Sequence, residues 1–318
     1  EHHRYTVSAL DAALDEIHRR IQFDVVNLEF PYLAHHRPSR AASGRAPPPL
    51  LIDAHEIAYD MVRQFGRTGG VGRKVYSALN WRKLRSEERT AFRSASGVYV
   101  CSLADRDRVL AEVPGTRTAV VPNAADVEFY RPAAPGAAGD GRTVLFFGLL
   151  STLPNIDGVL WFTREVWPRI AAAHPAARLK ILGKGAPPAV QALSGPGIEV
   201  VGFVEDLRPE LAAAAVLVVP LRLGGGTRLK IVEGMAMGKA IVSTALGAEG
   251  IEAVPGEQLL IADEPASFAA SVLGLLADPA LARRIGASAR RLAEDRYSWN
   301  AAAAVLDGFL REVVEARE

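Results

Sequence analysis

The order of apolar and amphipathic segments along the chain predicts a protein of alternating strands and helices. Short apolar runs, typical of strands that are buried on both faces, are separated by segments with the helical period. The apolar runs are residues 23–28, 50–54, 97–101, 118–121, 144–147, 179–182, 198–201, 216–219, 240–242 and 258–261. Helices are expected at residues 10–21, 73–93 and 155–173, from residues 104, 265 and 279, and from residue 300 to the end. This alternation predicts the α/β class, with parallel sheets covered by helices.

The alternation forms two series, and a segment with the composition of a linker separates them. Residues 131–141 read RPAAPGAAGDG and are rich in Pro, Gly and Ala. A length of 318 residues is also typical of about two domains. We therefore predict two Rossmann-like domains whose parallel sheets face a cleft. The expected boundaries are residues 1–131 for the first domain, 132–141 for the linker, 142–297 for the second domain and 298–318 for a C-terminal helix that packs back toward the first.

Composition and charge narrow the class of protein. The chain is 49% hydrophobic and 23% charged, as globular proteins with full cores are, and its net charge is +1. A charge so close to zero gives no reason to expect nucleic-acid binding. The single cysteine, Cys101, excludes a disulfide framework and a cysteine-ligated zinc site, and it fits a reducing cytoplasm. No apolar run reaches the ~18 residues of a membrane span.

A glycine-rich loop after one buried strand is the strongest candidate for a binding site. Residues 224–230 read GGGTRLK, here called the GGGTRLK loop, and a helical segment with Glu233 follows. Glycine lets the backbone approach a ligand closely, and the start of a helix presents N–H groups to an anion. Arg228 and Lys230 bring two cations, which suit a diphosphate. The carboxylate of Glu233 suits the hydroxyls of a ribose.

The loop therefore predicts a nucleotide-sugar site, in which the N–H groups around Gly226 and Thr227 would also face the diphosphate. The alternative is an ordinary strand-to-helix turn with solvated cations, since short motifs give false positives. The loop is no P-loop, because no Gly-Lys-Ser/Thr follows at the required spacing. It also lacks the third glycine of the dinucleotide-binding fingerprint.

Several further motifs occur in the same order as in a known family. On these motifs the chain resembles the retaining, GT-B-fold glycosyltransferases of family four, the glycosyl transferases group 1. The matching segments are residues 120–132 (VVPNAADVEFYRP), 144–148, 155–170, 179–185, 202–207 (GFVEDL) and 224–250. The resemblance begins near residue 20, and strand–helix units that open the first domain of the family do not precede residue 1. We therefore expect a chain truncated at its N-terminus.

The resemblance implies a bacterial enzyme that transfers a sugar, with retention, from a nucleotide-diphosphate sugar to an acceptor. The acceptor would be a polysaccharide or lipid-linked precursor, and neither a cofactor nor a metal ion is expected. Two alternatives stay open: a nucleotide-sugar-binding fragment without turnover, and a GT-B sugar-nucleotide epimerase.

The resemblance also implies roles for individual residues. Glu233 matches the second Glu of the Glu-x7-Glu signature, which holds the ribose, whereas Gly225 stands at the position of the first. Residues 148–152 lack the Arg and Lys that grip the diphosphate in the family, so Arg228 and Lys230 would carry that charge. His55 matches the histidine that lies across the cleft near the transferred sugar, and it is the candidate catalytic residue. Candidates for the base or the cleft, with an ordinary loop as the alternative, are Gly148, Gly183 and Val204.

Two other features carry weaker expectations. Residues 63–93 are basic and helix-like, which predicts either a solvated face or peripheral contact with the inner face of a membrane. No His/Asp/Glu cluster has metal-ligand spacing in the sequence. Four histidines without a motif are expected at the surface, namely His2, His3, His35 and His36.

Overall fold

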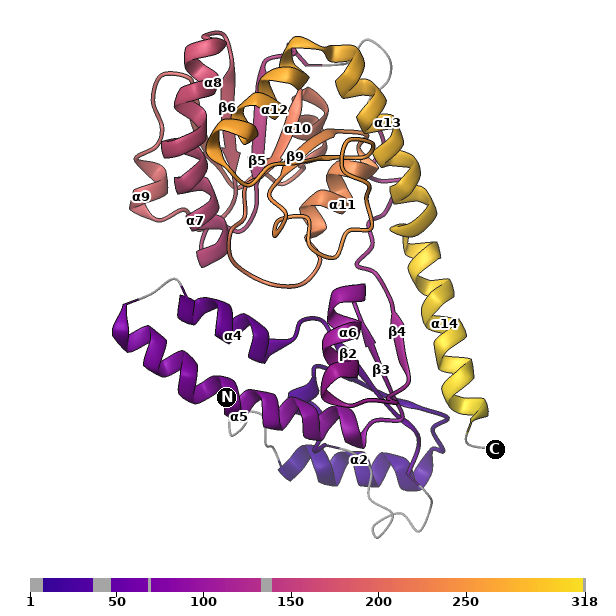
Figure 1. Cartoon of the computed structure of the whole chain (residues 1–318). Coiled ribbons are helices and arrows are strands. Elements are labelled where there is room, and N and C mark those ends of the chain that lie inside the picture. Colours follow the sequence, from indigo (N-terminus) through magenta and orange to yellow (C-terminus); the bar gives the residue numbers. More distant parts are fainter. Residues whose placement is uncertain (1–7, 37–46, 68–69, 133–138, 317–318) are drawn as a thin grey trace. The chain divides into compact units, whose positions relative to one another are not determined.

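The computed structural model describes residues 8–36, 47–67, 70–132 and 139–316 (Figure 1). The chain divides into two compact units, Glu1–Pro122 with Ala303–Glu318 and Asn123–Ala302. The first unit contains a four-stranded sheet and the second a six-stranded sheet, and every strand pair is parallel. The predicted α/β class with parallel sheets is therefore confirmed.

The first unit is built on the strand order β1-β2-β3-β4. Its strands are β1 (Val26–Glu29), β2 (Leu50–Ala54), β3 (Gly97–Val100) and β4 (Thr118–Val120). Its helices are α2 (Ser8–Arg20), the 3-10 turn η1 (Pro31–Leu33), α4 (Ala58–Arg67), α5 (Val71–Ser94) and α6 (Leu103–Glu112). Successive strand residues point to opposite faces. Ile52 accordingly packs with Phe92 of α5 and Val109 of α6, while Leu51 packs with Phe309 of the last helix, α14 (Trp299–Glu315).

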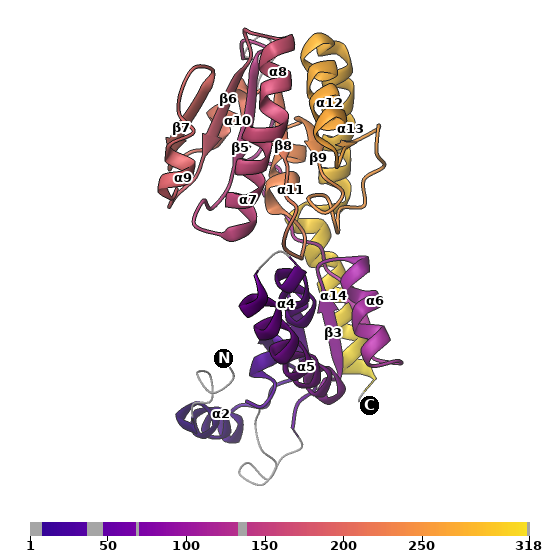
Figure 2. The ribbon, with the colours of Figure 1, turned by 60° about the vertical axis from the view of Figure 1, so that its left-hand side comes forward.

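The second unit has the strand order β10-β9-β8-β5-β6-β7, and in Figure 2 the strands β7, β6, β5, β8 and β9 follow one another from left to right. The strands are β5 (Thr143–Phe147), β6 (Arg178–Leu182), β7 (Ile198–Gly202), β8 (Val216–Val219), β9 (Ala240–Ser243) and β10 (Leu260–Ile261). The helices are α7 (Leu153–Trp161), α8 (Trp167–Ala173), α9 (Pro188–Gln191), α10 (Arg208–Ala213), α11 (Leu229–Ala236), α12 (Pro265–Ala277) and α13 (Pro279–Arg296). The strands β5, β8 and β9 are buried along almost their whole length, as the continuous apolar runs predict.

The division between the units falls at residues 122 and 123, nine residues before the predicted boundary at 131. The segment after Pro122 joins the second unit through hydrogen bonds. The backbone N–H of Ala125 donates to the carbonyl of Tyr297 at 2.8 Å, and the hydroxyl of Tyr130 donates to Glu233 at 3.2 Å. Within the predicted linker, residues 133–138 lie outside the described residues.

The helix predicted at residues 155–173 is interrupted. A π-helical turn, Phe162–Val166, separates α7 from α8. Pro168, the second residue of α8, has no N–H to donate to the carbonyl of Arg164, so the regular α-helical bonding is broken there. The apolar periodicity alone predicted one continuous helix, because it takes no account of the hydrogen bond that the proline cannot make.

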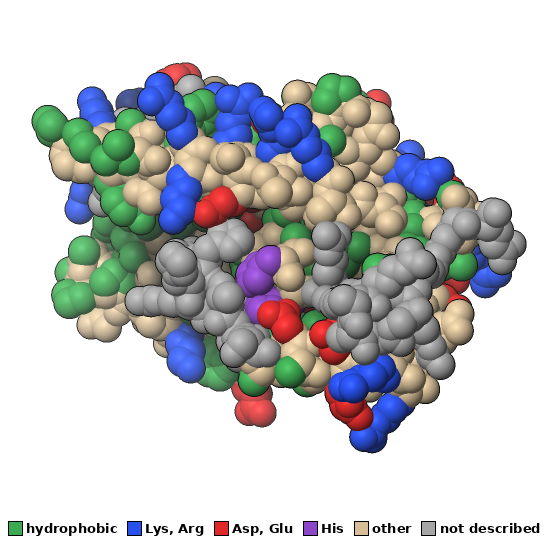
Figure 3. All heavy atoms as spheres, turned by 90° about the horizontal axis from the view of Figure 1, so that it is seen from below, with side chains coloured by type: hydrophobic (Ala, Val, Ile, Leu, Met, Phe, Trp, Pro, Cys, Tyr) green, Lys and Arg blue, Asp and Glu red, His purple; other side chains and the backbone are tan. Residues whose placement is uncertain are grey.

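No single helix among the described residues is long and apolar enough to cross a membrane. The helices α12 and α13 reach the necessary length and hydropathy only when they are counted together, and the chain bends by 103° between them. The face in Figure 3 shows Lys and Arg together with Asp and Glu, in keeping with the net charge of +1.

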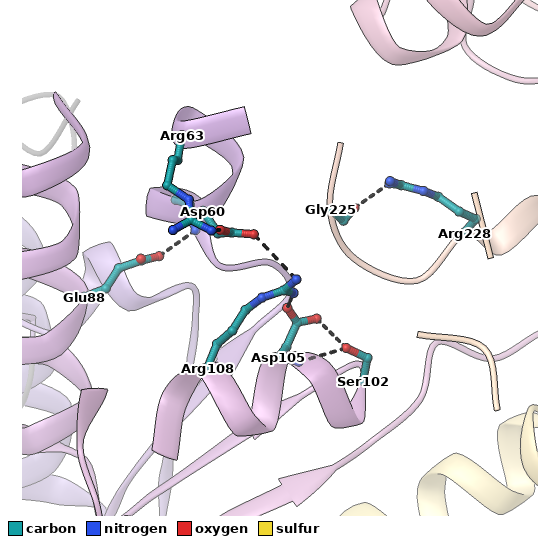
Figure 4. Close-up of polar contacts among 9 residues, drawn as sticks. Asp60, Arg63, Glu88, Ser102, Asp105, Arg108, Gly225 and Arg228 are labelled. Carbon is teal, nitrogen blue, oxygen red and sulfur yellow. Dashed lines mark hydrogen bonds and ion pairs between the residues drawn. The ribbon is translucent and has the colours of Figure 1, made fainter. Parts of the chain in front are cut away.

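Helix α4, which the sequence analysis missed, is anchored by a carboxylate from another helix. The buried Glu88 of α5, labelled in Figure 4, points toward the start of α4. It accepts hydrogen bonds from the N–H groups of Ala58 and Tyr59 at 2.9 and 3.2 Å. These N–H groups belong to the first turn of α4 and have no partner within that helix. Burial raises the pKa of Glu88 to about 7, although both hydrogen bonds oppose this.

A second buried carboxylate ties α6 to the same region. Asp105 accepts from Arg108 at 2.6 Å and from the hydroxyl of Ser102, the N-cap of α6, at 2.7 Å. Arg108 also lies 3.5 Å from Asp60 of α4, which pairs in turn with Arg63 at 3.2 Å (Figure 4). Helices α4, α5 and α6 are therefore held together by polar contacts as well as by the apolar core.

The raised pKa of Glu88 predicts a pH-dependent stability. The folded protein holds this proton more tightly than the unfolded chain, so the free energy of unfolding falls as the pH rises from about 4.5 to about 7. Relative to Glu88→Gln, the wild type should lose on the order of 2 kcal/mol between pH 5 and pH 8, measured by urea denaturation. Glu87→Gln, a partly exposed neighbour 3.9 Å from Lys83, is the control and should show no such difference. A difference independent of pH would contradict the prediction.

Candidate functional site

The GGGTRLK loop lies where the direction of the sheet order reverses. From β5 the chain proceeds outward to β6 and β7, whereas β8, the other neighbour of β5, is followed by β9 and β10 on the opposite side. Sheets of this kind bind ligands at the carboxyl ends of the two strands beside the reversal. Gly148 follows β5, and the GGGTRLK loop leads from β8 into α11. Two of the predicted segments thus meet at one edge of the second unit.

Lys230 links the two sides of this reversal. Its Nζ donates to Oδ1 of Asn155, in α7, at 2.7 Å and lies 4.4 Å from the ring centre of Phe146, in β5. A Cβ atom at Gly148 would come within 2.7 Å of the same nitrogen, so a side chain at this position would displace the end of Lys230. Lys230 therefore supplies a cation at the end of β5, where residues 148–152 contain none.

The environment of Lys230 makes its charge depend on pH and on nearby anions. Burial, and secondarily the nearby Arg228, lower the pKa of Lys230 to about 7, while Glu233 acts in the opposite direction. At neutral pH the amine is therefore only partly protonated. An anion bound beside it would restore the full charge, because an opposite charge favours the protonated form.

The remaining residues of the loop are held by the backbone and by glycine conformations. Gly224 and Gly226 adopt φ angles of 104° and 75°, which side chains other than glycine rarely allow. Arg228 folds back over the loop, and its Nη1 donates to the carbonyl of Gly225 (Figure 4). Thr227 is buried, and its carbonyl accepts from Nδ2 of Asn123 at 3.3 Å. Arg228 is also the N-cap of α11, but its side chain makes no capping hydrogen bond.

Glu233 lies one turn into α11 and is held by Tyr130. The tyrosine hydroxyl donates to Oε1 of Glu233 at 3.2 Å. Burial raises the pKa of Glu233, while this hydrogen bond and Lys230 oppose the shift. Burial also raises the pKa of Tyr130 to about 12, so its hydroxyl stays protonated and remains a donor. Tyr130 and Asn155 were missed in the sequence, although Tyr130 lies within the motif of residues 120–132.

Gly183 and Val204, the other two predicted residues of the second unit, differ in their surroundings. Gly183 packs directly against Gly148, since a Cβ at Gly183 would lie 1.8 Å from the Gly148 carbonyl oxygen. Its N–H donates to the carbonyl of Gly202 at 2.7 Å, which brings the ends of β5, β6 and β7 together. Val204 lies in the loop after β7 and packs partly against the core.

In the first unit, His55 belongs to a small group of polar side chains at the carboxyl ends of β1 and β2. Nε2 of His55 lies 2.7 Å from Oε2 of Glu29 and 3.6 Å from Oδ2 of Asp53. Glu29 and Asp53 are partners in the register of the two parallel strands. The ring of Phe30 lies 4.6 Å from that of His55. The carboxylates therefore fix the orientation of the imidazole.

This group corrects the expectation that no cluster has metal-ligand spacing. One ligand atom from each of Glu29, Asp53 and His55 lies within 4.8 Å of the others, so the three residues could hold a metal ion. The spacing was missed because the residues come from two strands that are neighbours only in the sheet. Desolvation raises the pKa of Asp53, and the adjacent His55 opposes this shift. In the structure the imidazole hydrogen-bonds to Glu29, and Asp53 lies just beyond hydrogen-bond distance.

One histidine expected at the surface is buried. Only 1% of His36 is exposed, and its Nδ1 lies 2.7 Å from Oδ1 of Asp11 in α2. His35 is exposed as expected, and His2 and His3 lie outside the described residues. The partner of His36 is 25 residues away in the sequence, so no local pattern could predict its burial.

Comparison with known proteins finds a family match within the second unit. Residues 141–278 match the family model of glycosyl transferases group 1. A curated relative, an uncharacterized 44.6 kDa protein in the cps region of Klebsiella pneumoniae, is 28% identical over 139 residues. That match covers 41% of this chain and 36% of the relative, so the chain spans about a third of that protein.

Solved structures are similar over almost the whole chain. Sucrose-phosphate synthase from Thermosynechococcus elongatus has a TM-score of 0.75 at 20% identity, covering 96% of this chain and 77% of the other. Anabaena Alr3699/HepE, solved in complex with UDP, has a TM-score of 0.73 at 17% identity, covering 96% and 82%. These similarities show the GT-B fold. With the family match they support a group 1 glycosyltransferase.

The lowered pKa of Lys230 predicts a stability that rises with pH. An unfolded chain binds this proton up to about pH 10, whereas the folded protein releases it near pH 7, so the unfolding free energy increases between those values. Relative to Lys230→Met, the wild type should gain on the order of 2 kcal/mol between pH 7 and pH 9 in urea denaturation. Lys184→Met, at an exposed lysine, is the control. If the difference in unfolding free energy between wild type and Lys230→Met did not change with pH, the lowered pKa of Lys230 would be refuted.

Proposed function

We propose that the protein is a retaining glycosyltransferase whose second unit binds a nucleotide-diphosphate sugar at the GGGTRLK loop. The observation that carries this proposal is the position of the Lys230 ammonium, held by Asn155 beside Gly148 at the reversal of the sheet. A cation, a helix start and a glycine-lined backbone meet there, which is the combination that a diphosphate requires. The carboxylate of Glu233 lies one turn further along α11 and suits a ribose.

Structural neighbours support the chemical class of the sugar donor. Alr3699/HepE was solved with UDP, with UDP-glucose, and with UDP and glucose. We carry over to this chain the class, a nucleotide sugar, and leave the base to experiment. The acceptor in the proposal is a polysaccharide or lipid-linked precursor, which would place the enzyme in the cytoplasm at the inner face of the membrane.

In the proposed reaction the bond between the anomeric carbon and the diphosphate breaks, and an acceptor hydroxyl forms the new bond on the same face of the sugar. Arg228, Lys230 and the N–H groups around Gly226 and Thr227 stabilise the negative charge on the departing diphosphate, an electrostatic role. The proton of the acceptor hydroxyl leaves with the diphosphate. Charge neutralisation is assigned to protein groups, so the proposal includes no metal ion or other cofactor.

His55 is the proposed catalytic residue of the first unit, where it would hydrogen-bond to the transferred sugar. Glu29 and Asp53 are its positioning residues, because they fix the ring through the 2.7 and 3.6 Å contacts. Gly183 would let the backbone approach the ligand beside Gly148, and Val204 would contact the base. These roles follow the family resemblance and the positions of strand ends.

Loss of the Glu233 carboxylate should weaken nucleotide binding. We expect Glu233→Ala to reduce the affinity for the best-binding nucleoside diphosphate, chosen from UDP and GDP by thermal shift, by roughly 10- to 100-fold in calorimetry, since hydrogen bonds to a charged group contribute about 1.5–3 kcal/mol. Tyr130→Phe keeps the carboxylate and should cost less. The exposed Glu257→Ala is the control. Unchanged affinity of Glu233→Ala for both nucleotides would remove the ribose role.

Loss of His55 should affect turnover but not binding of the nucleotide alone. We expect His55→Ala to lower kcat for hydrolysis of UDP-glucose, or of GDP-mannose if GDP binds better, by on the order of 10²-fold, with the affinity for the free nucleotide within about twofold of wild type. Glu29→Gln should give an intermediate loss, because the ring remains but is less firmly oriented. The exposed His35→Ala serves as the control.

The same assay separates the rival functions. Binding without release of nucleotide from either sugar nucleotide would favour a binding module, and formation of a different sugar nucleotide, detected by NMR, would favour an epimerase. A loss of nucleotide affinity in His55→Ala equal to the loss in kcat would contradict the proposed role of the histidine.

A further inference from the structure

Phe30, the first residue after strand β1, has a backbone conformation that a large side chain rarely adopts. Its φ angle is 78° and its ψ angle is 141°, and among the residues that the structure describes it is the only one other than glycine with a positive φ. A positive φ crowds the Cβ atom against the backbone, so it costs energy at every residue except glycine. Strained residues persist where their surroundings fix them, and they cluster at functional sites.

Hydrogen bonds fix the backbone of Phe30 from both sides. Its N–H donates to the carbonyl of Asp53 at 2.9 Å and so continues the pairing of β1 with β2. Its carbonyl accepts from the N–H of Leu33 at 3.2 Å, which closes the turn η1. A glycine at position 30 could make the same hydrogen bonds without strain, since they involve only the backbone. The turn alone therefore does not explain a phenylalanine at this position, and the reason lies in its side chain.

The ring of Phe30 contacts two other rings. Its centre lies 4.6 Å from that of His55, at an interplanar angle of 46°, and 5.1 Å from that of Tyr32, at 12°. Both distances fall in the range of favourable contacts between rings. Tyr32 belongs to η1, which begins directly after Phe30. The turn therefore supplies one ring that contacts the imidazole and a second ring that stacks on the first.

The polar contacts of His55 hold only one edge of its ring. Nε2 lies 2.7 Å from Oε2 of Glu29 and 3.6 Å from Oδ2 of Asp53. An ionised carboxylate can only accept a hydrogen bond, so we assign the proton of the neutral ring to Nε2, which leaves Nδ1 as an acceptor. A hydrogen bond at one atom does not fix the tilt of the imidazole plane. The ring of Phe30 restricts that tilt, because it occupies the space beside the imidazole.

We propose that Phe30 is a positioning residue for His55, and that its strained backbone places the phenyl ring where it fixes the plane of the imidazole. The inference rests on the proposed function, in which His55 hydrogen-bonds to the transferred sugar. With Nε2 held by Glu29, the ring offers Nδ1 to a sugar hydroxyl, which donates the hydrogen bond. Small displacements of such a group lower the rate strongly. The backbone strain is thus the energetic cost of a fixed imidazole.

Paired substitutions separate the backbone strain from the packing of the ring. Phe30→Gly and Phe30→Ala remove the same ring, but only glycine adopts a φ of 78° without strain. We expect Phe30→Gly to melt at least about 2 °C above Phe30→Ala. At Arg117, an exposed residue directly before β4 without a positive φ, alanine should melt above glycine instead. A melting temperature of Phe30→Gly at or below that of Phe30→Ala would overturn the proposal.

The mobility of the His55 ring can be measured without turnover. In the full chain labelled with 13C-histidine, the ring signals of His55 are those that His55→Ala removes. We expect NMR relaxation to give lower order parameters for the ring C–H bonds of His55 in Phe30→Gly than in wild type. Tyr76→Ala, which removes an aromatic ring that is 65% exposed on α5, should leave them unchanged. Equal order parameters in Phe30→Gly and wild type would overturn the proposal.

Turnover shows whether this positioning serves the reaction. In the hydrolysis of the sugar nucleotide, Phe30→Gly should lower kcat roughly tenfold, with nucleotide affinity within about twofold of wild type. In a His55→Ala background the same substitution should lower kcat no further, because Phe30 acts through His55. Equal losses in both backgrounds would overturn the proposal. An absence of turnover in the wild type would instead contradict the proposed function, and the order parameters of the His55 ring would still decide the role of Phe30.

Discussion

The buried ammonium of Lys230 is the interaction on which the candidate site of the second unit depends. Burying a charge costs several kcal/mol unless the surroundings compensate for the lost water. Here the compensation comes from the side-chain oxygen Oδ1 of Asn155, the ring face of Phe146 and the more distant carboxylate of Glu233. It is incomplete, as the lowered pKa shows. A group in this state gains most from an anion, so under the proposed function the same burial that weakens the fold would favour the binding of a diphosphate.

The space that Lys230 and its neighbours occupy also limits which residues fit at the ends of the adjacent strands. A side chain at Gly148 would displace the end of Lys230, and a Cβ at Gly183 would lie only 1.8 Å from the carbonyl oxygen of Gly148. Asn123 holds the loop from the other side through the carbonyl of Thr227. Glycines at strand ends in this unit are therefore explained by close approach of named groups, which is a stronger argument than the glycine content of a motif.

The sequence predicted well those features that depend on local pattern. Strands β2 and β8 lie at the expected residues, 50–54 and 216–219, because a strand buried on both faces is a continuous apolar run. Helix α4 was missed because its N-terminal cap, Glu88, comes from another helix 30 residues away. The loop residues of the site lie in one segment, so the sequence predicts them as a group. Their hydrogen-bond partners could not be predicted, since Asn155 is 75 residues from Lys230 and Tyr130 is 103 residues from Glu233.

Helix α5 shows how the two faces of one helix can differ in their surroundings. Its inner face is fixed by a buried carboxylate and an apolar core, so its 24 residues, about 36 Å long, present their outer side chains in a fixed order. Apolar groups lie in the first turns of that face, and cations follow in the later turns. Averaged over the whole helix, such an arrangement gives little net amphipathicity, which is why the sequence could not separate a solvated basic face from a docking surface. The exposed fractions of individual side chains show which of them lie on the outer face, and these fractions require the fold.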